Sequence, residues 1–309
     1  MDPIRIAIVG MGKIARDQHL PAILGDEAFS LAATVSPLAE QTVAGVPHRA
    51  SLDALLADGP AVDAIALCTP PQVRYDLATQ ALAHGIHVFL EKPPGATLAE
   101  VDALESQAAE TGVTLFAAWH SRFAAGVAPA RAWLAERRID SVSIVWREDV
   151  RVWHPGQAWI WQPGGLGVFD PGINALSIAT HILPRPFFLR AGTLAIPANR
   201  AAPIAADLTF CGTAGMTIHV DLDWRQTGPQ RWDIVVETDA GTCTLSNGGA
   251  VLTLPGSAVH GEDREYSGLY AHFATLVRTG RSEIDTRPLK LVADVFLRAR
   301  RESVEAFND

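Results

Sequence analysis

Three side chains in this sequence have the chemistry and the spacing of an acid–base site. Lys92 lies in Glu91-Lys92-Pro93, directly after an apolar stretch, and Asp170 precedes Asn174 by four residues. This spacing puts Asp170 and Asn174 on one face of a helix, so both can reach one substrate. Lysine and aspartate can take a proton, whereas an asparagine amide can only orient a hydroxyl group. The sequence leaves open whether Lys92 or Asp170 accepts the proton; their alternative roles are a surface lysine and a helix N-cap.

A second group of chemically useful residues lies between positions 146 and 161, where four of the chain's eight tryptophans are found. A tryptophan ring can stack on the apolar face of a sugar, and polar neighbours can bind its hydroxyl groups. The alternative is that these tryptophans belong to the hydrophobic core. The predicted substrate-binding residues are His120, Glu148, Trp153, His154, Asp170 and Asn174.

A glycine-rich turn follows the strand that we expect at residues 4–9. Its sequence, Gly10-Met11-Gly12-Lys13-Ile14-Ala15, has the form G-x-G-x-x-A. Gly10 permits a tight turn, Gly12 lets backbone N–H groups approach a pyrophosphate, and Ala15 allows the next helix to pack closely. Because the turn directly follows a strand, the motif predicts a dinucleotide-binding site.

Strands and helices alternate over the first 120 residues, which predicts a doubly wound parallel sheet of the Rossmann type. The expected strands are 4–9, 29–35, 62–68, 85–90 and 113–117, and the expected helices are 14–24, 73–84 and 101–109. The carboxyl ends of parallel strands share one edge, where ligands of such sheets bind. The residues predicted to contact the dinucleotide at this edge are Gly10, Gly12, Lys13, Ile14, Ala15, Ser36, Thr69, Pro70, Pro71, Glu91 and Lys92.

Ser36 stands at the end of the second strand, the position that contacts the adenine ribose. An acidic residue there would select NAD through the ribose 2′-hydroxyl, and serine supplies no carboxylate. The next residues, Pro37 and Leu38, offer no arginine to hold a 2′-phosphate. We therefore expect NADP as the cofactor, with NAD as an alternative; the structural alternative is that Ser36 only begins a turn.

The second half of the chain is organised differently. Polar and apolar residues alternate over 216–224, as in a sheet with one buried and one wet face. Further strands are expected at 141–146, 232–238, 241–245 and 250–254, and helices at 129–137, 269–278 and 289–307. We expect residues 1–121 to form a dinucleotide-binding domain and 122–309 to form an α+β domain, built on an open and mostly antiparallel sheet, for substrate binding and oligomerisation.

Four motifs together resemble one known family. They are G-x-G-x-x-A at 10–15, T-P-P at 69–71, E-K-P at 91–93 and G-G-x-x-x-x-D-x-G-x-N at 164–174. The chain resembles the glucose–fructose oxidoreductase/inositol dehydrogenase (Gfo/Idh/MocA) family over its whole length. Within it, residues 92–98, 153–157 and 169–176 are similar to the group of bacterial L-arabinose 1-dehydrogenases and D-galactose 1-dehydrogenases.

The resemblance implies NAD(P)-dependent oxidation of an aldopyranose of the L-arabinose, D-galactose or D-fucose type at C1, giving a lactone. It also implies homo-oligomers formed through the sheet of the second domain; the alternative is that the two C-terminal helices cover that sheet. Family members commonly carry a histidine four residues after the aspartate, and Asn174 stands there instead, which removes one candidate base. The alternative function is a non-catalytic protein that senses a dinucleotide and a sugar.

The composition of the chain argues against several kinds of partner and site. The formal net charge is −9, and basic residues do not cluster with aromatic ones, so we expect no nucleic-acid partner. No apolar run approaches the length of a membrane span, and the N-terminus lacks a signal-peptide pattern, so we expect a cytoplasmic protein. The three cysteines are far apart, and we expect neither a disulfide framework nor a metal site.

Overall fold

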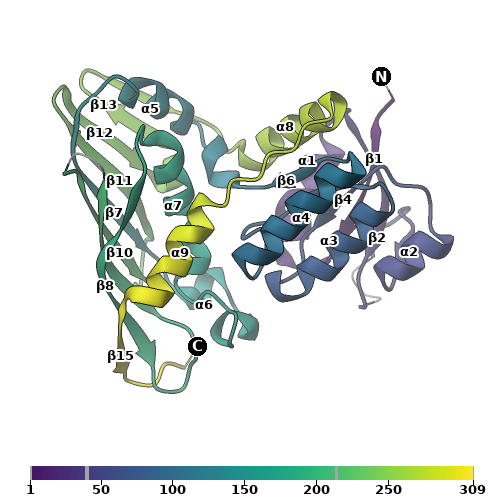
Figure 1. Ribbon diagram of the computed structural model, residues 1–309, viewed down its shortest axis with the longest axis horizontal. Helices are drawn as coiled ribbons and strands as arrows, with labels where there is room; N and C mark the ends of the chain where they lie inside the picture. Colours follow the sequence, from purple (N-terminus) through teal and green to yellow (C-terminus); the bar gives the residue numbers. More distant parts are fainter. Residues whose placement is uncertain (1, 39–41, 213–214, 309) are drawn as a thin grey trace. The chain divides into compact units, whose positions relative to one another are not determined.

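Two compact units make up the computed structural model, which describes residues 2–38, 42–212 and 215–308. Unit 1 consists of Met1–His120 and a return segment, Glu265–Thr286, which the sequence analysis had placed in the second domain. Unit 2 consists of Ser121–Arg264 and Arg287–Asp309. Figure 1 shows the return segment in yellow-green, beside the purple and blue strands and helices of unit 1. None of the described helices is long and apolar enough to cross a membrane.

Unit 1 is built on the doubly wound parallel sheet that the sequence predicts. Its strands are β1 (Ile4–Val9), β2 (Phe29–Val35), β3 (His48–Arg49), β4 (Ala64–Leu67), β5 (His87–Leu90) and β6 (Leu115–Ala117), in the order β3-β2-β1-β4-β5-β6. All five pairings are parallel. Strands β4 and β5 are almost entirely buried, which explains why they read as continuous apolar runs in the sequence.

Helices cover both faces of this sheet. They are η1 (Ala15–His19), α1 (Leu20–Leu24), α2 (Leu52–Asp58), η3 (Pro71–Val73), α3 (Arg74–Ala83), α4 (Leu98–Thr111) and α8 (Glu265–Thr279). Helices α2, α3 and α4 contribute Leu52, Leu82 and Leu104 to an aliphatic core with Val9 and Val88. Helix α4 starts with a capping box, in which Thr97 and Glu100 bind each other's backbone N–H groups.

The return segment completes the other face of the sheet. Phe29, Phe89 and Phe116 project from β2, β5 and β6, and α8 packs Tyr270 and Phe273 against them, with the Phe89 and Tyr270 ring centroids 5.0 Å apart. Beyond α8, the chain runs parallel to β6 and forms a bridge between its residue 283 and that strand. The aromatic face of the sheet is therefore buried by residues that lie about 160 to 240 positions later in the chain.

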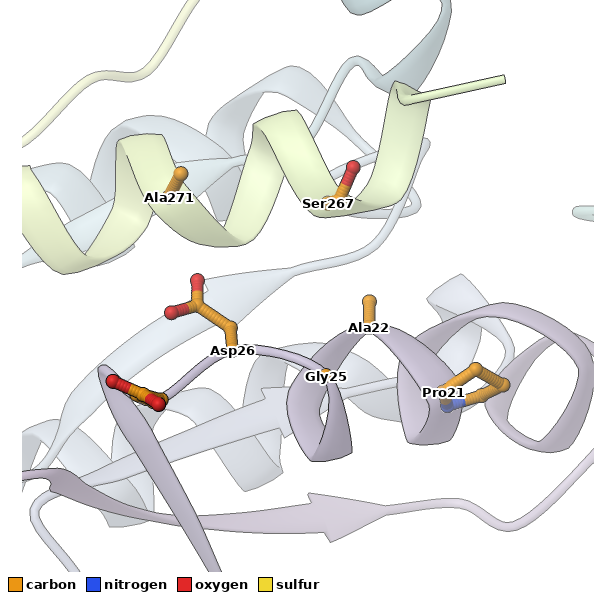
Figure 2. Close-up of a pocket in the computed structure, with 7 residues that line it drawn as sticks. Pro21, Ala22, Gly25, Asp26, Ser267 and Ala271 are labelled. Atoms are coloured by element: carbon orange, nitrogen blue, oxygen red, sulfur yellow. The ribbon is translucent and has the colours of Figure 1, made fainter. Parts of the chain in front are cut away.

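A surface pocket of about 500 Å³ lies on another side of α8. It is lined by residues that include Pro21, Ala22, Gly25 and Asp26 near the end of α1 and Ser267 and Ala271 of α8 (Figure 2). Helix α1 leads from this end into the amino end of β2. The pocket therefore lies at the edge of the sheet opposite the carboxyl ends of the strands, where the candidate residues of unit 1 are found.

Unit 2 is built on a nine-stranded sheet. Its strands are β7 (Ile139–Arg147), β8 (Phe187–Pro197), β9 (Ala205–Gly212), β10 (Thr217–Asp223), β11 (Arg231–Thr238), β12 (Gly241–Ser246), β13 (Val251–Leu254), β14 (Ser257–His260) and β15 (Arg300–Val304). Their order is β14-β13-β12-β11-β7-β10-β9-β8-β15. Neighbours are antiparallel except β7 with β10 and β8 with β15, which agrees with the expected mostly antiparallel sheet.

One face of this sheet carries helices. The helical elements of unit 2 are α5 (Val127–Leu134), α6 (Val150–Trp153), η5 (Ala158–Trp161), α7 (Phe169–Ile182), η6 (Asn247–Gly249) and α9 (Arg287–Arg298); η4 (His120–Phe123) joins the units. Figure 1 shows α5, α7 and α9 along one face. In β7, buried Val142, Ile144 and Trp146 alternate with more accessible Ser143 and Val145, so the second face stays open to solvent.

The C-terminal helix expected at 289–307 is shorter in the structure. Helix α9 ends at Arg298, and Arg300–Val304 pairs with Thr193–Pro197 of β8 as strand β15. The residues after 298 favour a helix by local propensity, but a strand forms because β8 offers them an edge to pair with. The sequence also failed to indicate β3, β8, β9, β14 and α2.

Candidate active site

The glycine-rich turn has space for a bound phosphate. Gly10 has a φ of +91°, and a Cβ there would lie 2.9 Å from Thr69 Cγ2, so this position requires glycine. A Cβ at Gly12, by contrast, would meet no described atom within 4 Å. Thr69 Oγ1 is buried without a hydrogen-bond partner among the described residues. The space at Gly12 and the unused donor at Thr69 fit the diphosphate of a dinucleotide.

The helix that follows the turn begins as predicted. The Arg16 N–H donates to Gly12 O at 3.2 Å, so the N–H groups of the first turn remain available to an anion. Ala15 is fully buried and allows close packing, while Ile14 is more than one-third exposed. Lys13 pairs with Asp17 on the surface of the helix.

Ser36 lies at the carboxyl end of β2, as the sequence predicts. It is buried, its N–H donates to Arg49 O at 3.0 Å, and its hydroxyl accepts from the Leu38 N–H at 3.3 Å. No described residue of this turn brings a carboxylate to the strand end, although residues 39–41 lie outside the described part of the chain. The position therefore has the neutral character on which the expectation of NADP depends.

Arg74 organises the loops around Lys92, a role that the sequence analysis missed. Its guanidinium group is buried and donates hydrogen bonds to the carbonyl oxygens of Thr69, Glu91 and Pro93. Two of these carbonyls flank Lys92, and the third belongs to the Thr69-Pro70-Pro71 turn. One buried cation thus connects two loops at the carboxyl edge of the sheet, here called the rim.

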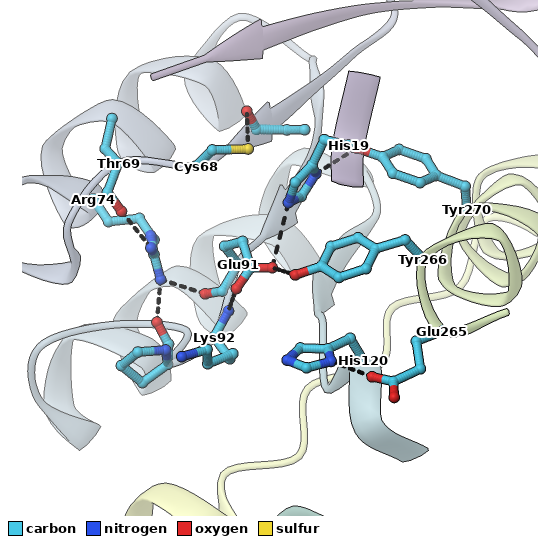
Figure 3. A network of polar contacts seen from close by, with 12 residues as sticks. His19, Cys68, Thr69, Arg74, Glu91, Lys92, His120, Glu265, Tyr266 and Tyr270 are labelled. Atoms are coloured by element: carbon cyan, nitrogen blue, oxygen red, sulfur yellow. Dashed lines mark hydrogen bonds and ion pairs between the residues drawn. The ribbon is translucent and has the colours of Figure 1, made fainter. Parts of the chain in front are cut away.

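Glu91 points into the interior of unit 1 (Figure 3). One carboxylate oxygen, Oε1, accepts from the Tyr266 hydroxyl at 2.5 Å and lies 3.3 Å from His19 Nε2, while Oε2 accepts from the Lys92 N–H at 2.5 Å. Burial alone would raise the pKa of Glu91, but the His19 hydrogen bond and the charges of His19, His120 and Lys92 lower it to about 2. Glu91 is therefore a buried carboxylate anion at neutral pH.

His19 is the last member of this series of polar contacts, here called the polar chain, which also includes Tyr266, Glu91 and the Lys92 N–H. It ends the π-helical turn η1, which precedes Pro21, a residue that lacks the N–H needed for a regular helical hydrogen bond. Its Nδ1 lies 2.7 Å from the Tyr270 hydroxyl, and its Nε2 faces Glu91. His19 thereby links the Tyr270 hydroxyl to the Glu91 carboxylate.

His120, predicted as a substrate-binding residue, also belongs to unit 1. Its Nδ1 pairs with Glu265, and its ring stacks on Tyr266 with centroids 5.3 Å apart (Figure 3). Burial lowers the pKa of His120, but the charge and hydrogen bond of Glu265 and the charge of Glu91 outweigh burial, so the net pKa is raised. The residues at 265 and 266 were not found from the sequence because they lie about 145 positions after His120.

Unit 2 brings together three of the predicted substrate-binding residues, Glu148, His154 and Asp170. Glu148 follows β7 and is almost fully buried, and its carboxylate accepts from the indole N–H groups of Trp224 and Trp232. His154 lies between two carboxylates, with Nε2 3.3 Å from Glu148 Oε1 and Nδ1 3.6 Å from Asp170 Oδ2. The result is a row of alternating carboxylate and imidazole groups.

Asp170 and Asn174 lie in the first two turns of α7, as their spacing predicts. Asp170 is buried, and the side-chain oxygen of Asn174 is also buried. Asn174 Oδ1 and His154 Nδ1 have no hydrogen-bond partner among the described residues. Buried polar atoms are rarely left unpaired, so these two atoms indicate a place where a polar ligand binds.

The tryptophans between 146 and 161 divide between two roles. Trp146 and Trp161 are buried in the core, the alternative that the sequence left open; Trp146 stacks on Trp232, and Trp161 meets Trp224 edge to face. Trp153 is 40% exposed, with its ring centroid 4.9 Å from that of Trp232. Of the buried pair and Trp153, only Trp153 keeps a ring surface available to a ligand. The described residues contain no group of three or more His, Cys, Asp and Glu side chains that could hold a metal ion.

Known proteins resemble this chain over its full length. Residues 4–119 match the family model described as "Oxidoreductase family, NAD-binding Rossmann fold" (Gfo/Idh/MocA). A galactose 1-dehydrogenase from Pseudomonas fluorescens is 46% identical over 100% of both chains. The crystal structure of a D-galactose-1-dehydrogenase from Rhizobium etli is 54% identical, covers 100% of this chain and 99% of its own, and has a TM-score of 0.95.

More distant structures share the fold. A 3-ketoreductase from Actinomadura kijaniata, solved with NADP and TDP-benzene, is 18% identical, covers 98% of this chain and 99% of its own, and has a TM-score of 0.85. The family motifs, the parallel sheet with its glycine turn and the full-length similarity agree with one another. The chain belongs to the Gfo/Idh/MocA family of oxidoreductases.

Proposed function

We propose that this oxidoreductase converts an aldopyranose of the D-galactose, L-arabinose or D-fucose type into its aldonolactone. The C1–H bond is lost as a hydride, the O1–H bond is lost as a proton, and a C1=O bond forms. The observation that carries the proposal is the buried row of Glu148, His154 and Asp170, beside the unpaired atoms of Asn174 and His154. The two full-length relatives named as galactose dehydrogenases support the same substrate class.

The unit 2 residues supply both the hydrogen-bond donors and the acceptors that sugar hydroxyl groups need. Asn174 Oδ1 accepts a hydrogen bond from a hydroxyl group, and His154 Nδ1 donates or accepts one according to its tautomer. Glu148 is held by two indole donors, so its position is fixed before a substrate arrives. The exposed ring of Trp153 offers an apolar surface to the C–H face of a pyranose.

Proton removal from O1 is assigned to Lys92 or Asp170. Asp170 is buried beside the His154 imidazole, which stabilises its negative charge or receives the proton from it. Lys92 is fixed at the rim, between two carbonyls that Arg74 holds. Asn174 orients the hydroxyl but takes no proton at neutral pH.

The dinucleotide is assigned to the glycine turn, Ser36, Thr69 and the Glu91-Lys92 segment of unit 1. When bound, a nicotinamide dinucleotide supplies the hydride acceptor. Gly12 and the start of η1 would hold its diphosphate, and the neutral end of β2 favours NADP over NAD. NAD remains the alternative cofactor.

The chain is proposed to form homo-oligomers through the open face of the unit 2 sheet. That face presents small side chains, such as Ser143, Thr209 and Val235, together with charged ones, such as the paired Arg147 and Asp221, and both kinds can contact a second copy. Light scattering of the purified protein tests this proposal, and a monomer at micromolar concentration would contradict it.

The direct test of function is spectrophotometric. The purified chain is mixed with NADP⁺ or NAD⁺ and a panel of D-galactose, L-arabinose, D-fucose and D-glucose, and absorbance is followed at about 340 nm, where the reduced nicotinamide absorbs. We expect turnover with the first three sugars, because they share ring stereochemistry apart from the C5 substituent. An absence of turnover with all of them, despite measurable nucleotide binding, would favour the sensor alternative.

A further inference from the structure

We propose that Tyr266, in the first turn of α8, is a positioning residue for Lys92 and His120 at the rim. The proposal rests on the function proposed above, because it assigns these two residues to the active site. Tyr266 lies 174 positions after Lys92 in the sequence, but it contacts Glu91 and His120 directly. A single side chain thereby connects the two rim residues that the sequence analysis selected separately.

The first connection runs through Glu91. Tyr266 donates to Glu91 Oε1 at 2.5 Å, and Glu91 Oε2 accepts the backbone N–H of Lys92 at 2.5 Å (Figure 3). The carboxylate therefore joins the Tyr266 hydroxyl to the main chain of Lys92. Because Glu91 is ionised and Tyr266 is buried, this is a charge-assisted hydrogen bond in a medium of low polarity, where such bonds are strongest.

The second connection runs through the ring of Tyr266. Its face stacks on the imidazole of His120 at an interplanar angle of 19°. The preceding residue in the same helical turn, Glu265, accepts a hydrogen bond from His120 Nδ1. A carboxylate partner fixes Nδ1 as the protonated nitrogen, and the Tyr266 ring fixes the plane in which the imidazole lies.

The same helix offers a matched control in Tyr270. Its hydroxyl is also buried, and its partner is His19 Nδ1 at 2.7 Å. Tyr270 thus belongs to the same polar chain, but its hydroxyl reaches Glu91 only through His19. Replacement of either tyrosine by phenylalanine removes one buried hydroxyl group and preserves the ring, and the larger loss of stability is expected for Tyr266→Phe because its partner is a buried carboxylate.

The first readout of the test does not depend on turnover. The chain contains three lysines, Lys13, Lys92 and Lys290, so ¹⁵N-lysine labelling gives three backbone amide signals, and Lys92→Arg assigns one of them. In Tyr266→Phe we expect the Lys92 amide to shift and to exchange with solvent at least about tenfold faster, because the carboxylate that holds it is no longer fixed. In Tyr270→Phe the Lys92 signal should stay close to its wild-type position.

The second readout compares the change in kcat with the change in the Kd for NADP⁺. Tyr266→Phe should lower kcat for the aldose by about tenfold, since misplacement of catalytic groups by a fraction of an ångström has effects of this size, with the Kd for NADP⁺ within about twofold of wild type. Tyr270→Phe should keep kcat within about twofold of wild type. Melting temperatures of both variants show whether their stabilities fell equally.

Two results would overturn the proposal. An unchanged Lys92 amide in Tyr266→Phe would show that Glu91 is held without the hydroxyl. Equal losses of kcat in both variants would show a general effect of α8 packing. If the wild-type chain oxidises no aldose, the proposed function fails by itself, while the amide readout still decides whether Tyr266 positions the Lys92 segment.

Discussion

Replacement of Glu91 by glutamine should destabilise unit 1 in a manner that depends on pH. Three donors converge on the Glu91 carboxylate, namely the Tyr266 hydroxyl, His19 Nε2 and the Lys92 N–H. A glutamine side chain has the same shape but only one acceptor oxygen, and its amide nitrogen would face at least one of these donors. At neutral pH, the variant therefore loses a buried anion and leaves a donor unsatisfied.

The size and sign of the effect follow from the pKa of Glu91, which falls from 4.5 to about 2 in the folded chain. Because the folded pKa is the lower one, ionisation stabilises unit 1 above pH 4.5, and this stabilisation is lost as the pH falls through about 2. The difference between the two pKa values corresponds to about 3 kcal/mol at pH 7 and to about half of this at pH 3. The gap between wild type and Glu91→Gln should shrink by about half over this range.

Amide hydrogen exchange measured by mass spectrometry gives the opening free energy of β5 and α8 separately from that of unit 2. Wild type and variant are compared at the same pH, so the pH dependence of intrinsic exchange cancels. The control is Glu100→Gln, the same substitution at a partly exposed carboxylate that accepts two backbone N–H groups in the capping box of α4. It should destabilise the protein by about 1 kcal/mol or less. A gap for Glu91→Gln that is below 1 kcal/mol, or equal at pH 7 and pH 3, would refute this reasoning.

The other predictions concern the reaction. Lys92→Ala should lower kcat by about 10² to 10⁴ while the Kd for the dinucleotide, measured by calorimetry, stays within about tenfold; retention of half the wild-type kcat would exclude Lys92 as the base. Ser36→Asp should move the ratio of kcat/KM values from NADP⁺ toward NAD⁺, and a wild-type preference of about a hundredfold for NAD⁺ would contradict the placement of Ser36. Asn174→Ala should lower kcat/KM by about 1 to 3 kcal/mol without displacing the acid limb of the pH–rate profile, whereas Asp170→Asn should alter that limb. An acid limb that moves in Asn174→Ala but not in Asp170→Asn would exchange the roles assigned to these two residues.

Local signals in the sequence were sufficient for most of unit 1. Strands β1 and β2 occupy the predicted residues because continuous apolar runs end at glycine or serine turns. Helix α4 begins at Leu98, three residues before the expected 101, because the capping box of Thr97 and Glu100 starts the helix through hydrogen bonds between neighbours in sequence. Helix α2 was missed although Ser51 caps it, because its seven residues are too few for a clear apolar period.

Elements that depend on distant partners could not be predicted in this way. Strand β15 exists because β8 lies beside it, and its own sequence favours a helix. Strand β8 alternates less regularly than β10, and a register shift between Leu189 and Ala191 interrupts its pattern.

In the candidate site, too, residues selected by local patterns were found, and residues that act through distant contacts were missed. The four-residue spacing of Asp170 and Asn174 selected these two residues, and the tryptophans between 146 and 161 drew attention to their polar neighbours Glu148 and His154, which the structure places in contact with each other. Spacing carries no information about Arg74, which reaches Lys92 only through the backbone carbonyls around it. Tyr266 could not be predicted either, because helix propensity and apolar period do not indicate which sheet a helix will cover.

The discontinuity of unit 1 has a consequence during protein synthesis. When the first 120 residues have left the ribosome, the sheet can form, but the phenylalanines of β2, β5 and β6 still lack the helix that covers them. At typical elongation rates of about 5 to 20 residues per second, the return segment follows roughly 10 to 30 seconds later. During this interval, an aromatic surface is exposed on a nascent chain whose second unit is already being made. A gene fragment that ends at residue 121 would keep this surface permanently, so the dinucleotide-binding half should be expressed with residues 265–286 attached.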